Sequence, residues 1–463
     1  MDETDLAVVG GGPGGYAAAI RAGHLGLDVT LVDQDGADGL GGACLHRGCI
    51  PSKALLSATG VAHRAATATE MGVHADPTVD TGEARAWTAG VVDRLAGGVG
   101  RLCDRAGVDV RAGTARFADE HTLAVEGADA GELAFERAVV ATGSRPVELS
   151  GLPLDAAGVW TSREALALET VPDRLVVVGA GYVGLELSTV YARLGTEVTV
   201  VEALDRPLPG FEADLARYVR RSLTDEGVAF HFGYAATDRR ETDDGVAVVA
   251  ESDDGEREFV GDRVLVAVGR EPVTGTVAPG NAGVEPDDSG FLATDEHCRT
   301  DREHVYAVGD VAGEPMLAHK ATAEGVVAAE DAAGEVASVA GRAIPAAVFT
   351  DPEVATVGHT EAEAEAAGHD PAVGEFRLGA SGRALTEDRP LGLARVVADA
   401  DSGRVLGGQV VGPHASEVIA QVALAVETDA TLADLGATVQ VHPTLAEAVS
   451  EAAESALGRA IHT

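Results

Sequence analysis

The sequence predicts an α/β protein of several domains, and three observations support this prediction. The chain has 463 residues, which is too many for a single hydrophobic core. A strand–turn–helix–strand pattern occurs twice, at residues 6–33 and 175–202. Beyond about residue 345 the pattern changes to strands separated by turns and followed by helical stretches. We therefore expect two doubly wound α/β domains and a separate α+β domain at the C-terminal end.

The composition predicts a globular protein with a strongly acidic surface. Hydrophobic residues make up 46% of the chain, while 75 acidic and 34 basic residues give a formal net charge of −41. This balance is typical of a solvated acidic shell around an ordinary core, as in halophilic proteins. Nucleic acid and anionic membranes are not expected partners, because phosphate binding requires clustered lysine and arginine. No signal peptide precedes the first strand and no apolar run is long enough to span a membrane, so we expect a cytoplasmic protein.

The repeated pattern predicts two dinucleotide-binding units with Rossmann-like folds. Both "LAVVGGGPGGYAAAIRAGHLGLDVTLVD" and "LVVVGAGYVGLELSTVYARLGTEVTVVE" contain G-x-G-x-x-G between a strand and a helix, and both end in an acid, Asp33 or Glu202. The glycines are Gly10, Gly12 and Gly15 in the first copy and Gly179, Gly181 and Gly184 in the second. They permit a tight turn, close approach of a pyrophosphate and close helix–strand packing, while the acid binds a ribose. The helix N-terminus offers free N–H groups to the phosphates.

Three further apolar runs are expected to return the chain to these sheets. "AVVATGSRP" (138–146) and "VLVAVGREP" (264–272) are predicted strands, each belonging to the unit that precedes it. "HVYAVGDVAG" (304–313) predicts a buried strand that places Asp310 at its carboxyl end, where α/β sheets bind ligands, although an acid in a turn is the alternative. The expected domains are 1–147 with its second part at 273–344, then 148–272, and finally 345–463.

Two of the four cysteines, Cys44 and Cys49, lie close together in "GGACLHRGCIPSKAL" (41–55). A structural disulfide across so short a loop would constrain the unfolded chain little. No second Cys/His pair has the spacing of a zinc site, so no metal is expected. Cys103 and Cys298 are isolated in the sequence. A reversible dithiol therefore remains, at the start of a predicted helix whose N-terminus favours a thiolate.

Several of these motifs together resemble the flavin-dependent pyridine nucleotide–disulfide oxidoreductases. "GGACLHRGCIPSKAL" is similar to the redox-active segment of that family, and "VHPTLAEAV" (441–449) is similar to its C-terminal His-Pro-Thr-x-x-Glu motif. With the two nucleotide units and the Gly309–Asp310 pair, the resemblance covers nearly the whole chain in the family's order. Through "HPTLAEAVSEAAESALGRAIH" it is closest to the members that oxidise dihydrolipoyl groups. It implies FAD in the first unit, NAD in the second, and a dimerisation domain at the C-terminal end.

The resemblance also implies roles for residues at matching positions. Cys44 would exchange with the substrate and Cys49 would face the flavin, while His442 would be the acid/base and Glu447 its orienting partner. The implied flavin-site residues are Asp33, Lys53, Ala115, Thr142, Gly143, Ser144, Asp310 and Ala318. The implied nicotinamide-site residues, besides the second set of glycines, are Glu186 as the partner of Lys53, Glu202 and Gly269.

Some of these positions have alternative interpretations. Thr444 and Glu447 match a capping box that opens the next helix, and a histidine in a loop can be purely structural. Tyr182 could cover the nicotinamide site or simply pack. Lys53 and Lys320 are the only lysines in the chain; the position of Lys53 beside the cysteines is informative, whereas the sequence assigns no role to Lys320.

The sequence favours NAD and a lipoyl dithiol, but it leaves alternatives open. Glu202 would bind a 2′-hydroxyl and repel a 2′-phosphate, with Arg206 following the acid rather than replacing it. Ala43 and His46 depart from the family's usual Thr and Asn, and His46-Arg47 could favour a small anionic disulfide reduced with NAD(P)H. A mercuric reductase lacks support because no cysteine follows Cys298, and a redox-silent nucleotide-binding subunit is the alternative outside the enzymes.

The expected partners are a lipoyl group and a second copy of the chain. The lipoyl group would belong to a 2-oxoacid dehydrogenase complex or to a glycine-cleavage lipoyl protein. The apolar spacing of residues 445–461 predicts a helix with a buried face. In the family, a two-fold interface brings this histidine segment to the cysteines of the partner chain, so we expect a homodimer with shared sites.

Overall fold

The computed structural model describes residues 2–462 and divides into two compact units. The first unit comprises Met1–Ala54, Thr81–Val147 and Gly269–Ala340, and the second comprises Leu55–Asp80, Glu148–Val268 and Gly341–Thr463. Each unit is described by itself below. Within residues 2–462, no helix combines the length and the apolar character needed to cross a bilayer.

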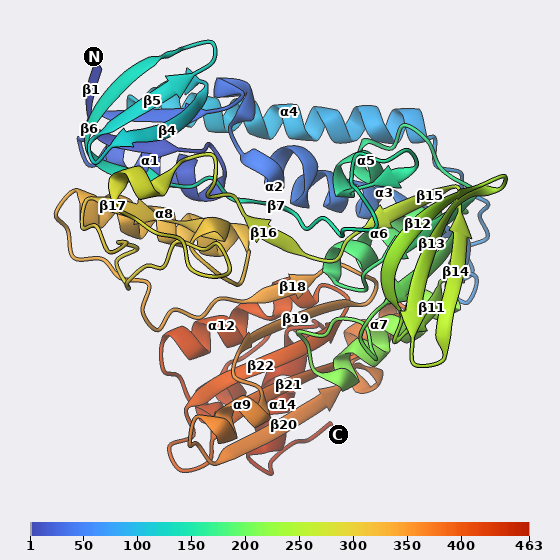
Figure 1. The fold of residues 1–463 in the computed structure, drawn as a ribbon. Helices are drawn as coiled ribbons and strands as arrows, with labels where there is room; N and C mark the ends of the chain where they lie inside the picture. Colours follow the sequence, from blue (N-terminus) through green and yellow to red (C-terminus); the bar gives the residue numbers. More distant parts are fainter. Residues whose placement is uncertain (1, 463) are drawn as a thin grey trace. The chain divides into compact units, whose positions relative to one another are not determined.

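The first unit is built on a mostly parallel sheet in the order β3-β2-β1-β6-β5-β4, with β17 also paired to β6 (Figure 1). Its strands are β1 (Asp2–Val9), β2 (Val29–Asp33), β3 (Asp109–Ala112), β4 (Thr114–Asp119), β5 (Thr122–Glu126), β6 (Gly131–Val140) and β17 (Val305–Ala307). Strand β6 runs parallel to both β1 and β17, whereas β5 is antiparallel to β6 and β4 to β5. The expected return of the chain to the first sheet is therefore confirmed.

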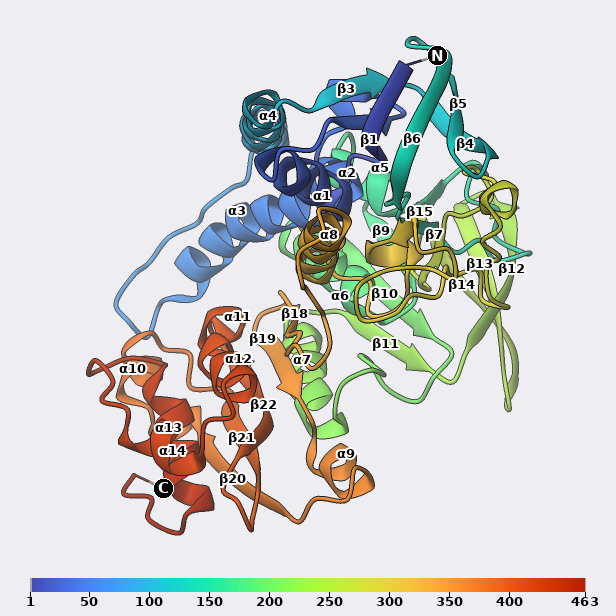
Figure 2. The ribbon, with the colours of Figure 1, turned by 90° about the vertical axis from the view of Figure 1, so that its left-hand side faces the viewer.

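Helices cover one face of this sheet because its strands alternate their apolar side chains between two cores. Leu6 and Val8 of β1 join a core with the helices α1, α4 and α8, while Ala7 and Val9 face a second core on the other side. The helices of this unit are α1 (Pro13–His24), α2 (Gly42–Arg47), the start of α3 (Cys49–Thr67), α4 (Thr81–Ala106) and α8 (Ala318–Ala332). Figure 2 shows α1 and α8 side by side. A Cβ on Gly325 would lie 2.2 Å from the Gly14 carbonyl oxygen, so glycine permits their close approach.

Short elements at the edge of the first unit carry several predicted site residues. Strands β7 and β16 pair antiparallel, and a 3-10 turn, η3, follows β17 directly. The bounds are β7 (Ser144–Pro146), β16 (Arg270–Pro272), η1 (Gly36–Gly39), η2 (Pro279–Ala282) and η3 (Gly309–Val311). Asp310 therefore follows a buried strand, as the sequence predicts.

The second unit contains the second nucleotide fold, a parallel sheet in the order β11-β10-β9-β15-β8. A three-stranded antiparallel sheet, β12-β13-β14, packs on one face through a shared core of valines. The strands are β8 (Val159–Trp160), β9 (Arg174–Val178), β10 (Glu197–Glu202), β11 (Ala229–Phe232), β12 (Ala235–Thr242), β13 (Gly245–Ser252), β14 (Gly255–Gly261) and β15 (Arg263–Val266). The helices are α5 (Ser162–Ala167), α6 (Tyr182–Arg193) and α7 (Ala213–Asp225). The start of the predicted strand at 264–272 pairs with β9 as β15, which confirms the return to this sheet, whereas residues 270–272 form β16 and pair with β7 in the first unit.

The C-terminal part of the second unit is an antiparallel sheet, β18-β19-β22-β21-β20, packed against helices (Figure 1). The strands are β18 (Ala346–Val348), β19 (Glu353–Gly358), β20 (Pro371–Arg377), β21 (Leu393–Asp399) and β22 (Val405–Gly412). The helical elements are α9 (Glu361–Ala366), η4 (Leu378–Ala380), α10 (Gly382–Thr386), α11 (Ala415–Val418), α12 (Ala420–Glu427), α13 (Leu432–Ala437) and α14 (Glu447–Ala456). This arrangement confirms the predicted α+β domain.

The last helix is shorter than the sequence predicts. Ala448, Val449, Ala452 and Ala453 form the expected buried face of α14. The helix ends at Ala456, however, because Gly458 takes a left-handed conformation with φ +69° and turns the chain. The prediction of a helix up to residue 461 is therefore wrong at its C-terminal end.

Candidate active site

The two cysteines lie on consecutive helices at the start of the candidate site. Cys44 is in α2 and half-buried, and Cys49 is the first residue of α3 and exposed; both side chains carry thiols. Gly48 separates the two helices, and a Cβ there would lie 2.9 Å from the Ala43 carbonyl oxygen. The short turn at Gly48 allows a second helix to begin directly at Cys49. The predicted helix start is confirmed.

Cys44 retains its proton in this reduced pair. Its hydrogen bond with Cys49 raises the pKa of Cys44 most, and burial and the charge on Cys49 raise it further, while the Lys53 ammonium lowers it partly. The thiolate is the reactive form of a cysteine. Together these contacts favour the protonated form of Cys44 within the pair.

His46, which departs from the family pattern, is bonded within its own segment. Its Nε2 lies 2.9 Å from the Leu40 carbonyl oxygen, so Nε2–H donates to that oxygen. The ring is half-buried, and the neighbouring Arg47 is exposed. The support that His46 gave to an anionic substrate is therefore weakened, because its ring is bonded to the backbone.

His442 and Glu447 form a hydrogen-bonded pair at the start of α14. The His442 side chain is 80% exposed, and its Nδ1 lies 2.9 Å from Glu447 Oε1. The other carboxylate oxygen accepts the backbone N–H of Thr444 at 2.8 Å. A carboxylate on Nδ1 fixes the ring with Nε2 directed to the surroundings, which is the arrangement of an oriented general base.

The electrostatics of this pair keep Glu447 ionised. Burial alone would raise the pKa of Glu447, but the backbone N–H of Thr444 and the His442 ring outweigh it, and the pKa lies below the usual value for a glutamate. The Thr444 hydroxyl has no hydrogen-bond partner within residues 2–462, and Ala446 occupies the N-cap position of α14. The alternative of a complete capping box is therefore wrong, because only the glutamate half forms.

The first glycine motif has the geometry of a dinucleotide cradle. Gly10 has φ +104°, which only glycine adopts readily, and a Cβ on Gly15 would lie 1.8 Å from the Gly10 carbonyl oxygen. At Gly12 a Cβ would meet nothing within 4 Å, so the backbone is open where a pyrophosphate approaches. Asp33 accepts the backbone N–H groups of Gly11 at 2.7 Å and Asp35 at 3.0 Å. The chain present here fits an adenine dinucleotide such as FAD.

The second glycine motif repeats this geometry closely. Gly179 has φ +105°, Gly181 is open, and a Cβ on Gly184 would lie 2.2 Å from the Gly179 carbonyl oxygen. Glu202 is buried and accepts the N–H groups of Ala180 at 2.7 Å and Leu204 at 2.9 Å.

Arg206, the cation nearest in sequence to Glu202, is bound by its own loop. Its guanidinium donates to the backbone carbonyls of Leu208, Pro209 and Phe211. Glu202 stands where a carboxylate would bind a ribose 2′-hydroxyl, and Arg206 is held by its own loop rather than free to bind a 2′-phosphate. These two observations fit NAD better than NADP.

Asp310 belongs to a hydrogen-bonded cluster that the sequence predicts only in part. Its carboxylate accepts the hydroxyl of Ser144, and Arg270 Nε donates to the same Ser144 oxygen at 2.7 Å. Arg270 also donates to the Ser144 carbonyl at 2.6 Å, which joins β7 to β16. Thr142 donates its hydroxyl to the Val273 carbonyl. Sequence reasoning did not include Arg270, although it directly follows Gly269.

The other predicted site residues lie on several different elements of the fold. Gly143 and Gly269 have positive φ angles of +72° and +132°. Ala115 is buried on β4, and Ala318 is the first residue of α8. Tyr182 opens α6 and is 41% exposed.

The Lys53–Glu186 pair remains a prediction. Lys53 lies one turn after Cys49 on α3, in the first unit. Glu186 is buried on α6 in the second unit, where Oε1 accepts the backbone N–H of Phe349 at 3.0 Å.

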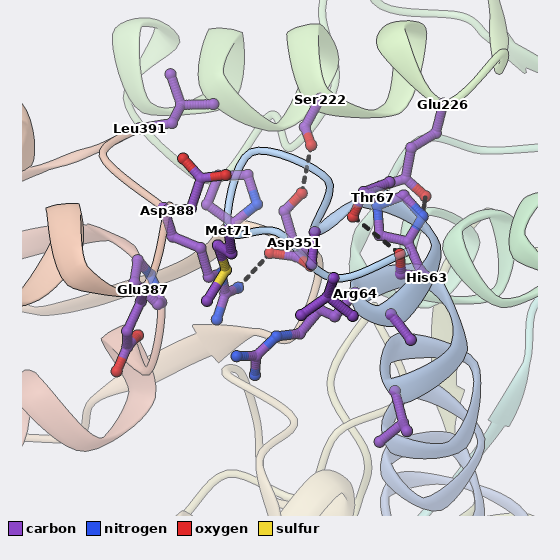
Figure 3. A pocket seen from close by; sticks show the side chains of 17 residues that line it. His63, Arg64, Thr67, Met71, Ser222, Glu226, Asp351, Glu387, Asp388 and Leu391 are labelled. Carbon is purple, nitrogen blue, oxygen red and sulfur yellow. Dashed lines mark hydrogen bonds and ion pairs between the residues drawn. The ribbon is translucent and has the colours of Figure 1, made fainter. Parts of the chain in front are cut away.

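A pocket of 520 Å³ in the second unit lies outside the predicted site (Figure 3). One of its walls carries Asp351, whose carboxylate binds Arg193 at 2.9 Å and also binds Arg389. Ser222 of α7 donates its hydroxyl to the Asp351 carbonyl. None of the predicted site residues lines this pocket. Within residues 2–462, no group of three or more acidic, His or Cys side chains could hold a metal ion.

Comparisons with known proteins agree with the geometry of the site. The family model described as pyridine nucleotide-disulphide oxidoreductase matches residues 4–325, and the model for that family's dimerisation domain matches residues 344–453. The chain is 55% identical to the dihydrolipoyl dehydrogenase of Haloferax volcanii, over 99% of this chain and 98% of that protein, and 55% identical to the one of Halobacterium salinarum with the same coverage. The crystal structure of LpdA from Mycobacterium tuberculosis matches with a TM-score of 0.90 and 30% identity, over 98% of this chain and 99% of that chain.

The two family models match consecutive parts of the chain. The first part contains both glycine cradles and the thiol pair, and the second part contains the C-terminal α+β domain. This chain belongs to the pyridine nucleotide-disulphide oxidoreductase family.

Proposed function

We propose that this protein works as a dihydrolipoyl dehydrogenase, which oxidises a dihydrolipoyl dithiol with NAD through bound FAD. The observation that carries the proposal is the hydrogen-bonded pair Cys44 and Cys49 at the start of α3, in a chain with two dinucleotide cradles. Full-length similarity to proteins named dihydrolipoyl dehydrogenase supports the same activity. The proposed site is catalytic at Cys44, Cys49, His442 and Glu447.

The chain's own residues would carry out a thiol–disulfide exchange. With Cys44 and Cys49 oxidised to a disulfide, His442 takes the proton of one substrate thiol, and the resulting thiolate attacks Cys44 and displaces Cys49 as a thiolate. The second substrate thiol attacks the mixed disulfide and passes its proton to Cys44 as Cys44 leaves, so that the substrate departs as a disulfide and the enzyme holds a Cys44 thiol, a Cys49 thiolate and a protonated His442. When bound, FAD and NAD would supply the chemistry that removes the electron pair from the dithiol and transfers it as hydride.

Each predicted domain has a part in this scheme. Segments 1–147 and 273–344 would hold FAD, with Asp33 at the ribose and Asp310 at the ribityl chain. Segment 148–272 would hold NAD through Glu202, and segment 345–463 would form the dimer. A homodimer agrees with the match to the family's dimerisation domain.

The active site would be shared between two chains. The cysteines lie in the first unit, while His442 lies in the segment that matches the dimerisation domain, on an exposed loop. We expect His442 to serve the cysteine pair of the partner subunit. Mixing inactive Cys49→Ser and His442→Gln chains under subunit exchange should restore activity to about a quarter of the wild-type level by random pairing. No recovery despite verified exchange would place base and dithiol in the same chain.

The proposed substrate is a lipoyl group on a carrier protein of a 2-oxoacid dehydrogenase complex or of the glycine-cleavage system. We place the protein in the cytoplasm, where structural disulfides are unusual. Reduction of a small anionic disulfide is the less favoured function, because relatives with 55% identity over nearly the whole chain are named dihydrolipoyl dehydrogenase.

A steady-state comparison tests the proposed function. Purified protein reconstituted with FAD is assayed with dihydrolipoamide and NAD, and separately with glutathione disulfide or bis-γ-glutamylcystine and NADPH. The proposal predicts turnover with the first pair that exceeds turnover with either disulfide. Faster reduction of a disulfide with NADPH would contradict it.

A further inference from the structure

Lys320 occupies a position that helix stability does not explain. It is the third residue of α8, in the first turn, and one of only two lysines in the chain. A cation near a helix N-terminus opposes the helix dipole. Its ion pair with Glu324 also has the less favourable order, because lysine precedes glutamate. The contacts of Lys320 therefore have to account for its presence.

Together, Lys320 and Glu324 hold both ends of one short turn. Lys320 Nζ donates to the Gly313 carbonyl at 3.0 Å and lies 2.9 Å from Glu324 Oε1. The other carboxylate oxygen, Oε2, accepts the backbone N–H of Gly309 at 2.7 Å. Both side chains are 12% exposed, so water competes little for these bonds.

The turn from Gly309 to Gly313 carries Asp310. Gly309 and Gly313 have φ angles of +77° and +142°, so both ends of the turn take backbone conformations that favour glycine. The Asp310 carboxylate in turn accepts the hydroxyl of Ser144. External contacts thus determine where this carboxylate lies.

We propose that Lys320 and Glu324 are positioning residues for the flavin site: they fix the turn from Gly309 to Gly313 so that Asp310 is presented in one orientation. The inference rests on the proposed function, since Asp310 serves a flavin only in a chain that binds one. Lysine suits this position because its compact ammonium donates both to a carbonyl and to a carboxylate, whereas an arginine would bring a larger planar fork.

Flavin binding by apoprotein variants tests the proposal without an activity assay. Lys320→Met removes the ammonium and keeps the apolar stem. Glu330→Gln is the matched control, because Glu330 lies on the same helix and pairs with Arg21 at 2.7 Å, away from the turn. For each apoprotein we would measure the Kd for FAD, the visible circular dichroism of bound flavin and the melting temperature.

Lys320→Met should raise the Kd for FAD about tenfold, the effect of losing one charged hydrogen bond, and should change the flavin dichroism. Glu330→Gln should change neither. Glu324→Gln should have an effect similar to that of Lys320→Met and, combined with it, should add less than its separate effect, because the two residues act as one unit. Glu324→Gln also serves as the test if Lys320→Met does not fold.

Two outcomes separate this proposal from the proposed function. A lower melting temperature for Lys320→Met with unchanged Kd and unchanged flavin dichroism would mean that the pair only stabilises the fold, which overturns the inference. A wild-type apoprotein that binds no FAD would instead contradict the proposed function.

Discussion

The four cysteines differ in reactivity because their surroundings differ. Cys49 is exposed at the start of α3. Burial raises the pKa of Cys103 to about 11 and that of Cys298 to about 12, with smaller contributions from nearby acids. Both buried thiols belong to the core under α1 and α8. They are therefore packing residues, and only the pair in 41–55 is available for chemistry.

Alkylation of the reduced protein tests this difference. With iodoacetamide at pH 8 to 9, we expect rapid labelling within the Cys44–Cys49 pair and none at Cys103 or Cys298, as read by peptide mass spectrometry. The folded protein keeps Cys103 and Cys298 protonated to a higher pH than the unfolded chain does, whose cysteines have a pKa of about 8.5. Burial of these two neutral thiols therefore stabilises the fold fully below about pH 8.5, and this stabilisation is lost as the pH rises toward 11 and 12. Labelling of Cys103 at the rate of a urea-unfolded control would contradict the assignment.

Substitution of Glu447 tests the orientation of the base. Glu447→Gln keeps the shape but removes the charge that holds His442 Nδ1, so we expect kcat to fall about 100-fold, within the range of a positioned base. Because the Glu447 pKa is depressed, the wild-type carboxylate stays ionised above the ordinary glutamate value of about 4.3 and loses this interaction only at lower pH. Titration of Glu447 itself should therefore add no pH dependence to the variant's deficit between pH 6 and 9. Glu451→Gln, on the same helix and paired with His462, is the control and should retain full activity.

The proposed catalytic residues stand in short sequence motifs, whereas the contacts that support the site do not. Cys44, Cys49 and His442 stand in contiguous patterns whose spacing can be read directly. Arg270 binds the hydroxyl and the carbonyl of Ser144, which lies 126 residues away in the sequence and is brought to it by the fold. No local pattern records such a contact.

At the scale of elements, the two glycines at the start of α6 have different physical roles. Gly184 allows the helix to approach β9, because a Cβ would lie 2.2 Å from the Gly179 carbonyl oxygen. Gly181 has φ −76° and open space around its Cβ position, so the fold itself does not require glycine there. The close approach of a phosphate requires an open backbone of this kind, so Gly181 fits a role in dinucleotide binding.

Paired alanine substitutions separate these roles. Gly181→Ala should leave the melting temperature within about 1 °C and weaken NAD binding at least tenfold, because the new methyl fills the phosphate cradle. Gly184→Ala should lower the melting temperature clearly, since the methyl meets backbone. Calorimetry and NAD titration of the holoenzyme measure both. Normal NAD affinity in Gly181→Ala would mean that NAD does not use this cradle.

The order and type of the main elements followed from the sequence, but some of their ends did not. Apolar runs ending in glycine predicted β1, β9 and their parallel partners, because buried parallel strands require continuous apolar residues. The end of α14 depends on Gly458 in a left-handed conformation, a backbone state that the apolar spacing of 445–461 does not reveal. The sequence also did not reveal that Ala446, rather than Thr444, takes the N-cap position of α14, because this depends on the local backbone conformation.

At the scale of the whole molecule, the net charge of −41 predicts a dependence on salt. Repulsion between carboxylates destabilises the folded chain in dilute buffer, and molar salt reduces the Debye length to about 3 Å. We expect the melting temperature and activity to rise from 0.1 M to at least 2 M KCl. Sucrose at matched osmolality is the control for effects other than screening. A flat or falling melting temperature in KCl would contradict this expectation.

Anaerobic reduction by substrate tests the central claim, that Cys44 and Cys49 form the dithiol between a lipoyl group and the flavin. Reconstituted protein is titrated with dihydrolipoamide while its visible absorption is recorded. We predict that one equivalent produces a long-wavelength band, as a thiolate beside the flavin would, and that Cys49→Ser abolishes the band while Cys103→Ser leaves it intact. A band that persists in Cys49→Ser, or a wild-type protein that dihydrolipoamide does not reduce, would contradict the account.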